Sequence, residues 1–236
     1  SACITKGLMG EELCDYESLK KAGATVITDD GRPVENPDML FKALQLSKEN
    51  GLLVACHCED LDIIDGGIIN KGKISEELGV KGMDRLSEDS ITERDILLCE
   101  KADAKIHICH VSTKGSAEII RNAKKRGVRV TCETCPHYFI YTDEKLLAKD
   151  ADYRMNPPLR EEEDRQAIIE AILDGTIDCI VTDHAPHAAE EKADFLKAPN
   201  GVVGLETSLA ATLTALYHTG KVSLSKIVSL MSENPR

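Results

Sequence analysis

The sequence predicts an α/β protein built on one parallel sheet, and three observations lead to this class. Short apolar runs recur along the chain, as expected for strands whose two faces are both covered. Each run is followed by a helical pattern or a loop, and this alternation is typical of a parallel sheet. No Gly-x-Gly-x-x-Gly or Walker loop follows any run, which disfavours the alternative of an open doubly wound sheet.

The preferred architecture is a partial (β/α)8 barrel of the TIM type, with about six of its eight strands present. Turn residues bound each apolar run, and no internal repeat or domain linker interrupts the series. The predicted strands cover residues 1–5, 24–28, 52–56, 105–109, 128–131 and 177–181.

Capping residues and glycines place the predicted helices between these strands. Asn36, followed by Pro37, is expected to begin a helix that ends before Gly51. Ser112 or Thr113 is expected to cap the helix at 116–126. The predicted helices are the one after Asn36 and those at 11–21, 91–101, 116–126, 161–173, 205–217 and 223–231.

Two connections are expected to be loops. Residues 59–88 are rich in Gly and Lys, and we expect a loop with one short helix that builds or covers a site. Residues 155–160 read Met-Asn-Pro-Pro-Leu-Arg, and the two prolines favour a fixed extended loop.

Composition limits the classes of partner. A length of 236 residues suits one α/β domain with a sizeable core. The net charge of −12 argues against nucleic acid and against a membrane surface, since both require exposed Lys and Arg. No apolar run approaches the roughly 20 residues of a membrane span, and no signal peptide is recognisable.

The nine cysteines are interpreted as small buried residues of a reducing cytosol, so a cytoplasmic location is expected. The pairs Cys56/Cys58 and Cys132/Cys135 have the close spacing of zinc or redox motifs. A structural zinc site usually combines two regularly spaced pairs, and Cys132 and Cys135 would alternate across a strand, so this interpretation is disfavoured.

Acids and imidazoles follow four of the predicted strands. A carboxylate at the tip of a buried strand is unfavourable unless a metal or a proton transfer uses it. Side chains alternate across a strand, so each of these four acids or imidazoles shares a face with the strand residues two and four positions before it. All four lie at the C-terminal ends of their strands, where barrel active sites lie. The sequence therefore predicts a metal centre formed by Asp30, His57, His110 and Asp183.

The sequence gives weaker support for a role of the neighbouring polar residues in this metal centre. Asp29 and His184 would point away from this face, with His184 orienting a loop or ligand. His107 opposes His110 and is expected to face a helix and bond to backbone. The role of His137 stays open between structure and substrate binding. Four further residues suit a substrate carboxylate or amide, although a plain turn explains the last two equally well: Asn156, His187, Asn200 and Gly201.

Five motifs occur in one order and together resemble the amidohydrolase superfamily, and within it the bacterial type I dihydroorotases. They are Thr-Asp-Asp-Gly, Ala-Cys-His-Cys-Glu-Asp, Cys-His-Val-Ser-Thr, Met-Asn-Pro-Pro-Leu-Arg and Thr-Asp-His-Ala-Pro-His. The resemblance runs from about residue 2 to residue 235. Single motifs are shared with hydantoinases and allantoinases, but an aspartate stands where those relatives commonly have a carboxylated lysine.

The resemblance implies two zinc ions. Asp30 would bridge them, His57 and His110 would bind the second, and Asp183 would ligate the first and transfer protons. It also implies that the four substrate residues named above hold the ring amide and carboxylate of the substrate.

One departure from the family pattern is evident. The family's first barrel strand carries a His-x-His pair followed by an arginine, and no His-x-His occurs in this sequence. The expectation is that residues 1–236 are a barrel fragment comprising strands three to eight, without the first strands and the flanking β domain. Such a fragment would hold one zinc ion or none and would not turn over substrate.

For the full-length protein, the resemblance implies reversible interconversion of N-carbamoyl-L-aspartate and L-dihydroorotate in pyrimidine biosynthesis. A homodimer is expected. Two alternatives stay open: a hydantoinase- or allantoinase-type cyclic amidohydrolase, and an inactive scaffold partner of aspartate transcarbamoylase.

Overall fold

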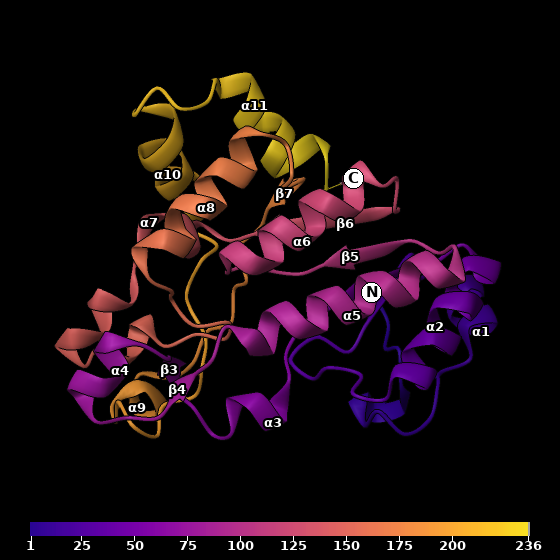
Figure 1. Ribbon diagram of the computed structural model, residues 1–236, viewed down its shortest axis with the longest axis horizontal. Coiled ribbons are helices and arrows are strands. Elements are labelled where there is room, and N and C mark those ends of the chain that lie inside the picture. The colour runs from indigo at the N-terminus through magenta and orange to yellow at the C-terminus, as the bar shows by residue number, and fades with distance from the viewer. Residues whose placement is uncertain (236) are drawn as a thin grey trace.

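A five-stranded parallel sheet organises the computed structural model, which describes residues 1–235 (Figure 1). The predicted parallel sheet is therefore confirmed. Residues 1–5, expected to be a strand, make two isolated bridges, a parallel one from Ala2 to Ile27 and an antiparallel one from Thr5 to Leu13, and do not form a strand. In spatial order the strands are β1 (Val26–Thr28), β2 (Leu53–Cys56), β5 (Ile106–Ile108), β6 (Val130–Thr134) and β7 (Cys179–Ile180).

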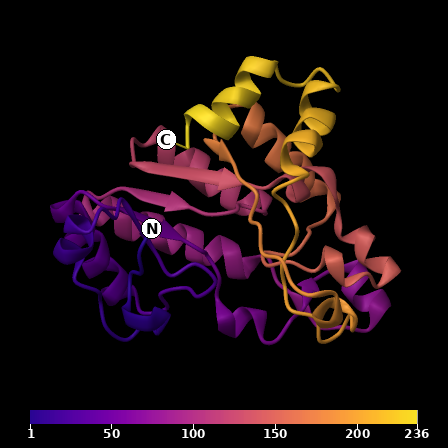
Figure 2. The same cartoon turned by 180° about the vertical axis from the view of Figure 1, so that it is seen from behind.

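Helices cover one face of this sheet, and the opposite view shows the strands in front of them (Figures 1 and 2). Two predicted caps are confirmed, because Asn36 accepts from the Asp38 and Met39 N–H groups and Thr113 accepts from the Ser116 N–H. No helix within residues 1–235 combines the length and the apolar character needed to cross a bilayer. The longer helices are α1 (Tyr16–Lys21), α2 (Pro37–Asn50), α5 (Leu86–Ala102), α6 (Lys114–Lys125) and α8 (Glu162–Leu173).

The last two predicted helices each end in a π-helical turn. They are α10 (Ser208–Thr212), continued by Leu213–Tyr217, and α11 (Leu224–Val228), continued by Ser229–Glu233. Short helical turns fill several connections: α3 (Leu61–Ile64), α4 (Lys73–Leu78), α7 (Pro136–Ile140), α9 (Ala189–Lys192), and 3-10 turns at Lys6–Leu8, Asp143–Ala148 and Ala151–Tyr153.

The long connection 59–88 is more ordered than predicted. Besides α3 and α4 it contains β3 (Ile69–Asn70) and β4 (Gly82–Met83), which pair in parallel as a second small sheet. Ile69 and Ile74 pack with Leu146 in a separate apolar cluster under this unit. Strands of two residues are too short to show an alternating pattern, so the sequence could not reveal them.

The two faces of the main sheet differ in polarity. Alternate residues of the strands, such as Ile106 and Val130, are buried under the helices in the main core. His107 and Thr131 lie on the opposite face, where His107 Nδ1 is 2.8 Å from Thr131 Oγ1 and its Nε2 is 3.1 Å from Glu133 Oε2. The expectation of a helix-facing His107 bonded to backbone was therefore wrong, because its partners are side chains on the face without helices.

Buried Arg160 fixes the proline-rich loop that carries Asn156. Its Nε donates to Ser112 Oγ at 3.0 Å, one Nη donates to Asn70 Oδ1 at 3.2 Å, and the other lies 3.2 Å from Glu88 Oε2. These partners belong to the β5–α6 connection, the small sheet and α5. One guanidinium therefore joins three parts of the fold to the loop, two of which, α5 and the β5–α6 connection, also bond directly through Glu88 and Ser112.

Replacing Arg160 by Met is expected to destabilise the chain by about 3–5 kcal/mol, because Glu88 would be left buried without its cation. Urea unfolding measures the loss. The matched control is Arg126→Met, which breaks a half-exposed pair with Glu100 and should cost about 1 kcal/mol or less. Equal losses in the two variants would contradict the structural role of Arg160.

Candidate metal centre

Three polar side chains from the ends of β1, β2 and β5 converge at one point. His57 Nδ1 lies 3.0 Å from His110 Nε2, and His110 Nε2 lies 3.3 Å from Asp30 Oδ1. The third side of this triangle, from His57 Nδ1 to Asp30 Oδ1, is 3.6 Å. The predicted proximity of these three residues is confirmed.

The triangle fits a zinc-sized ion. Zinc binds imidazole nitrogen and carboxylate oxygen at about 2.0–2.2 Å, so tetrahedral ligand atoms lie about 3.3–3.6 Å apart. The sides of the triangle lie close to that range. Two imidazoles and a carboxylate are also donors that zinc prefers. Asp30, His57 and His110 therefore form a group that could hold a metal ion.

Alternation alone does not place His110 in this group. Ile106 and Ile108 are buried under the helices, so strict alternation would send His110 to that covered face as well. Its backbone is left-handed instead, with φ 34°, and Asp183 also has a positive φ of 47°. Such conformations cost of order 1–3 kcal/mol in a residue other than glycine and cluster at functional sites. Two of the residues at this site, His110 and Asp183, are therefore held in a strained backbone conformation.

The site residues influence one another electrostatically. The hydrogen bond from His110 holds the pKa of Asp30 below its usual value. Burial lowers the pKa of His110, but the hydrogen bond and charge of Asp30 outweigh burial and raise it overall. Burial raises the pKa of Asp183. In the absence of a metal, Asp30 and His110 thus favour an ionic pair, whereas Asp183 retains a proton more readily than an ordinary aspartate.

One cavity of about 280 Å³ brings most of the predicted site residues together. His187 is the exception, since it lines a neighbouring cavity and its Nε2 donates to the Asn200 carbonyl at 3.0 Å. His184 accepts from the Gly204 N–H at 3.2 Å, in line with a loop-orienting role. The lining residues that the sequence predicted are Asp30, His57, His110, Asn156, Asp183, Asn200 and Gly201.

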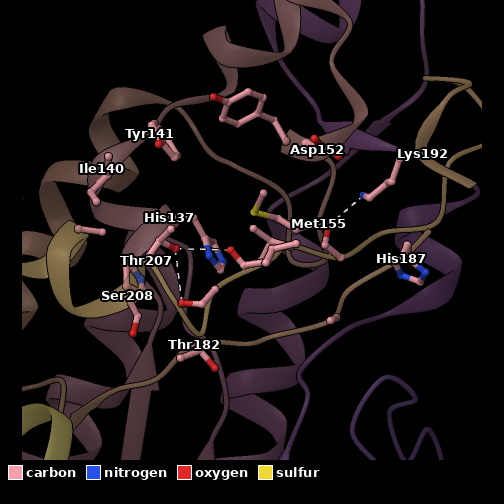
Figure 3. Close-up of a pocket in the computed structure, with 18 residues that line it drawn as sticks. His137, Ile140, Tyr141, Asp152, Met155, Thr182, His187, Lys192, Thr207 and Ser208 are labelled. Carbon is pink, nitrogen blue, oxygen red and sulfur yellow. Dashed lines mark hydrogen bonds between the residues drawn. The ribbon is translucent and has the colours of Figure 1, made fainter. Parts of the chain in front are cut away.

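The neighbouring cavity, also of about 280 Å³, is shown in Figure 3 and shares Ala185 and Gly201 with the first. His137 lines it and is only 6% exposed. Burial lowers the pKa of His137 to about 3, so the ring is neutral. Its Nε2 has no hydrogen-bond partner within residues 1–235. His137 is therefore a buried neutral imidazole with one ring nitrogen free of hydrogen bonds within the described residues.

Lys192 was missed by the sequence analysis. Its ammonium donates to four carbonyl oxygens, those of Ala151, Arg154, Pro199 and Gly201, at 2.9–3.1 Å. Figure 3 shows one of these bonds, from Lys192 to Gly201. These carbonyls belong to two loops: the one at 151–154 borders the cavity of Figure 3, and the one at 199–201 borders both cavities. Gly201 is needed at this point, because a Cβ there would lie 2.3 Å from the Ala185 carbonyl oxygen. The sequence gives no sign of these bonds, because Lys192 stands in a charged stretch after Glu190 and Glu191.

Glu59 was also missed, although it stands two residues after His57. It is 7% exposed, its Oε2 lies 3.2 Å from His57 Nε2, and its Oε1 accepts from Asn156 Nδ2 at 2.7 Å. A carboxylate that accepts from Nε2–H fixes the tautomer in which Nδ1 is free to bind a cation. Glu59 therefore orients both a predicted metal ligand and Asn156.

Replacing Glu59 by Gln is expected to weaken zinc binding by about 10–100-fold, the usual effect of removing a carboxylate that orients a metal-binding histidine. Competition of the metal-free chain with a chromogenic chelator measures the affinity. Glu49→Gln, an exposed substitution on α2, serves as the control and should bind zinc like the unmodified chain. An unchanged zinc affinity in the Glu59 variant would show that Glu59 does not orient His57 for metal binding.

Comparisons with known proteins agree on one group of relatives. A family model described as Dihydro-orotase-like matches residues 1–116. The chain is 49% identical over 233 residues to the dihydroorotase of Acetivibrio thermocellus, which covers 98% of the chain and 55% of the relative. It is 50% identical over 234 residues to that of Geobacter sp. strain M21, covering 99% and 55%. The chain thus spans about half the length of these curated relatives.

Solved structures show the same architecture. The L-hydantoinase of Arthrobacter aurescens matches with a TM-score of 0.84 at 25% identity, over 99% of this chain and 54% of that one. The dihydroorotase of Saccharomyces cerevisiae matches with a TM-score of 0.73 over 99% of this chain and 64% of that one. At 15% identity the second match shows the fold alone.

Proposed function

Because this chain is a dihydroorotase-like amidohydrolase, we propose that the whole protein interconverts N-carbamoyl-L-aspartate and L-dihydroorotate in pyrimidine biosynthesis. One observation carries this proposal: Asp30, His57 and His110 converge at a cavity that Asp183 and Asn156 also line. Ligands for a cation, a carboxylate that can exchange protons and an amide recognition group are what hydrolysis of a cyclic amide requires.

Asp30, His57 and His110 would hold zinc. When bound, the ion supplies Lewis-acid chemistry at the ring amide carbonyl and makes water more acidic. Glu59 keeps His57 in the required tautomer. The left-handed backbone at His110 keeps its ring at the same point. These residues therefore prepare the ligand geometry before any substrate arrives.

Asp183 is the proposed proton carrier. In hydrolysis, water adds to the amide carbon, the C–N bond breaks and the nitrogen must gain a proton. Asp183 would take a proton from the attacking water and pass it to that nitrogen, so it must begin ionised. The reverse cyclisation requires it protonated. A carboxyl whose pKa is raised by burial is better suited to both directions than an exposed one.

Asn156 is the proposed contact to the ring amide. Its Nδ2 donates to Glu59, which leaves its Oδ1 available to accept from a substrate N–H. The Gly201 N–H already donates to the Arg154 carbonyl at 2.9 Å. The loop at 200–201 would therefore act through Asn200 or through its shape rather than through that N–H. His187 would support the loop through its hydrogen bond to the Asn200 carbonyl.

Several properties of the whole protein remain proposals. They are two zinc ions per full-length chain, a homodimer, a cytoplasmic location and the assignment of residues 1–236 to barrel strands three to eight. An inactive scaffold that binds aspartate transcarbamoylase is a further proposal. Co-purification of the two proteins without measurable hydrolysis would support the scaffold over the enzyme.

The likeness to L-hydantoinase favours one alternative activity, hydrolysis of hydantoins. A substrate panel on the full-length protein separates the two, since only a dihydroorotase should require the acidic substituent on the ring. We expect turnover of L-dihydroorotate and none of hydantoin or allantoin. Turnover of hydantoin but not of dihydroorotate would overturn the proposed function.

In the same full-length protein, Asp183→Asn is expected to abolish turnover while the zinc held by Asp30, His57 and His110 remains largely bound, because the amide has similar size but cannot carry the proton. Zinc content per chain and the rate of dihydroorotate hydrolysis are the measurements. Asp194→Asn, an exposed change in the following loop, is the control and should leave the rate unchanged. Retained turnover in the Asp183 variant would exclude it as the proton carrier.

A further inference from the structure

A second group of metal-binding side chains lies at the same end of the sheet. Cys135 directly follows β6, His137 stands in α7, and Asp183 lies just beyond β7. One donor atom from each lies within 4.8 Å of the others. Together with Asp30, His57 and His110, six donors thus follow the ends of five neighbouring strands.

We propose that Cys135, His137 and Asp183 form a second metal position that takes zinc through a cysteine thiolate. The resemblance gives metal roles to Asp183 but none to Cys135 or His137. The proposal does not depend on the proposed hydrolytic activity, because metal binding can be measured without turnover.

The unpartnered ring of His137 is the first support. Its Nε2 is buried and has no hydrogen bond in the part of the chain that the structure describes. Leaving a buried polar atom without a partner costs about 1–3 kcal/mol. His137 also lines the cavity of Figure 3, so an ion has a route to the ring. A bound cation would satisfy the nitrogen that the fold leaves free.

Geometry is the second support. Zinc binds thiolate sulfur at about 2.3 Å and nitrogen or oxygen at about 2.0–2.2 Å, so its ligand atoms lie about 3.3–3.7 Å apart. The three donors lie within 4.8 Å of one another, so shifts of about 1 Å would bring them to ligating distance. Pro136 between Cys135 and His137 restricts the backbone that spaces these two donors.

The donor chemistry selects the metal. A thiolate, an imidazole and a carboxylate suit Zn²⁺ or Co²⁺ rather than Mg²⁺ or Ca²⁺, which prefer oxygen ligands. On binding, the Cys135 S–H bond breaks, the sulfur forms a bond to the metal and the proton leaves to solvent. Cys135 is completely buried and therefore cannot act as a nucleophile toward a dissolved substrate. Three protein ligands leave a coordination position open.

Cobalt titration of the metal-free 236-residue chain tests the proposal, because a cysteine thiolate bound to Co²⁺ gives a near-ultraviolet charge-transfer band. We expect this band and two cobalt ions per chain, one at each group of donors and one more than the resemblance implies for this fragment. Cys135→Ser should lose the band and bind one cobalt ion. The control is Cys132→Ser, a second buried free cysteine whose hydrogen bond to the Thr176 carbonyl serine can replace. It should keep the band and both ions.

His137→Gln gives a second readout if Cys135→Ser fails to fold by circular dichroism. It should require at least about tenfold more cobalt to reach half of the band intensity, since one of three ligands is lost. No band in the unmodified chain, a band that survives Cys135→Ser, or an unchanged titration of His137→Gln would each overturn the proposal. Absence of dihydroorotate turnover in the full-length protein would contradict the proposed function but not the second metal position, because the cobalt titration does not require turnover.

Discussion

Charge buried at the ends of parallel strands is the constraint on which the rest of the site depends. A carboxylate or imidazole removed from water is unfavourable unless another group compensates it. The half-exposed carboxylate of Asp30 lies against buried His110, buried Glu59 lies against buried His57, and Arg160 pairs with Glu88 deeper in the protein. These contacts also hold the loop that carries Asn156, because Glu59 accepts from Asn156 and Arg160 belongs to the same loop.

The strands and their polar ends could be predicted because both are local features of the sequence. Continuous apolar runs show parallel strands, and the acid or histidine after each run is plain in the sequence. The helix after Asn36 was equally predictable from its cap. Asp30, His57 and His110 were expected together and lie together, although the left-handed backbone at His110 was not foreseen.

What escaped prediction depends on distant partners. Glu59 is one acid among many in the sequence, and only the fold brings it against His57 and Asn156. The face of His107 could not be determined from alternation alone, because the sequence does not say which face the helices cover. The small sheet of β3 and β4 has too few residues for a periodic pattern.

Lys192 places an ammonium ion among backbone dipoles instead of beside an acid. The loops at 151–154 and 199–201 are thereby coupled through a single charged group, and neither can shift without breaking bonds to the other. Substitutions in the two loops should therefore be non-additive in free energy, as is usual for residues that share a partner. During divergence of the family, the lengths of these two loops would be constrained jointly, whereas a loop without such an anchor could vary alone.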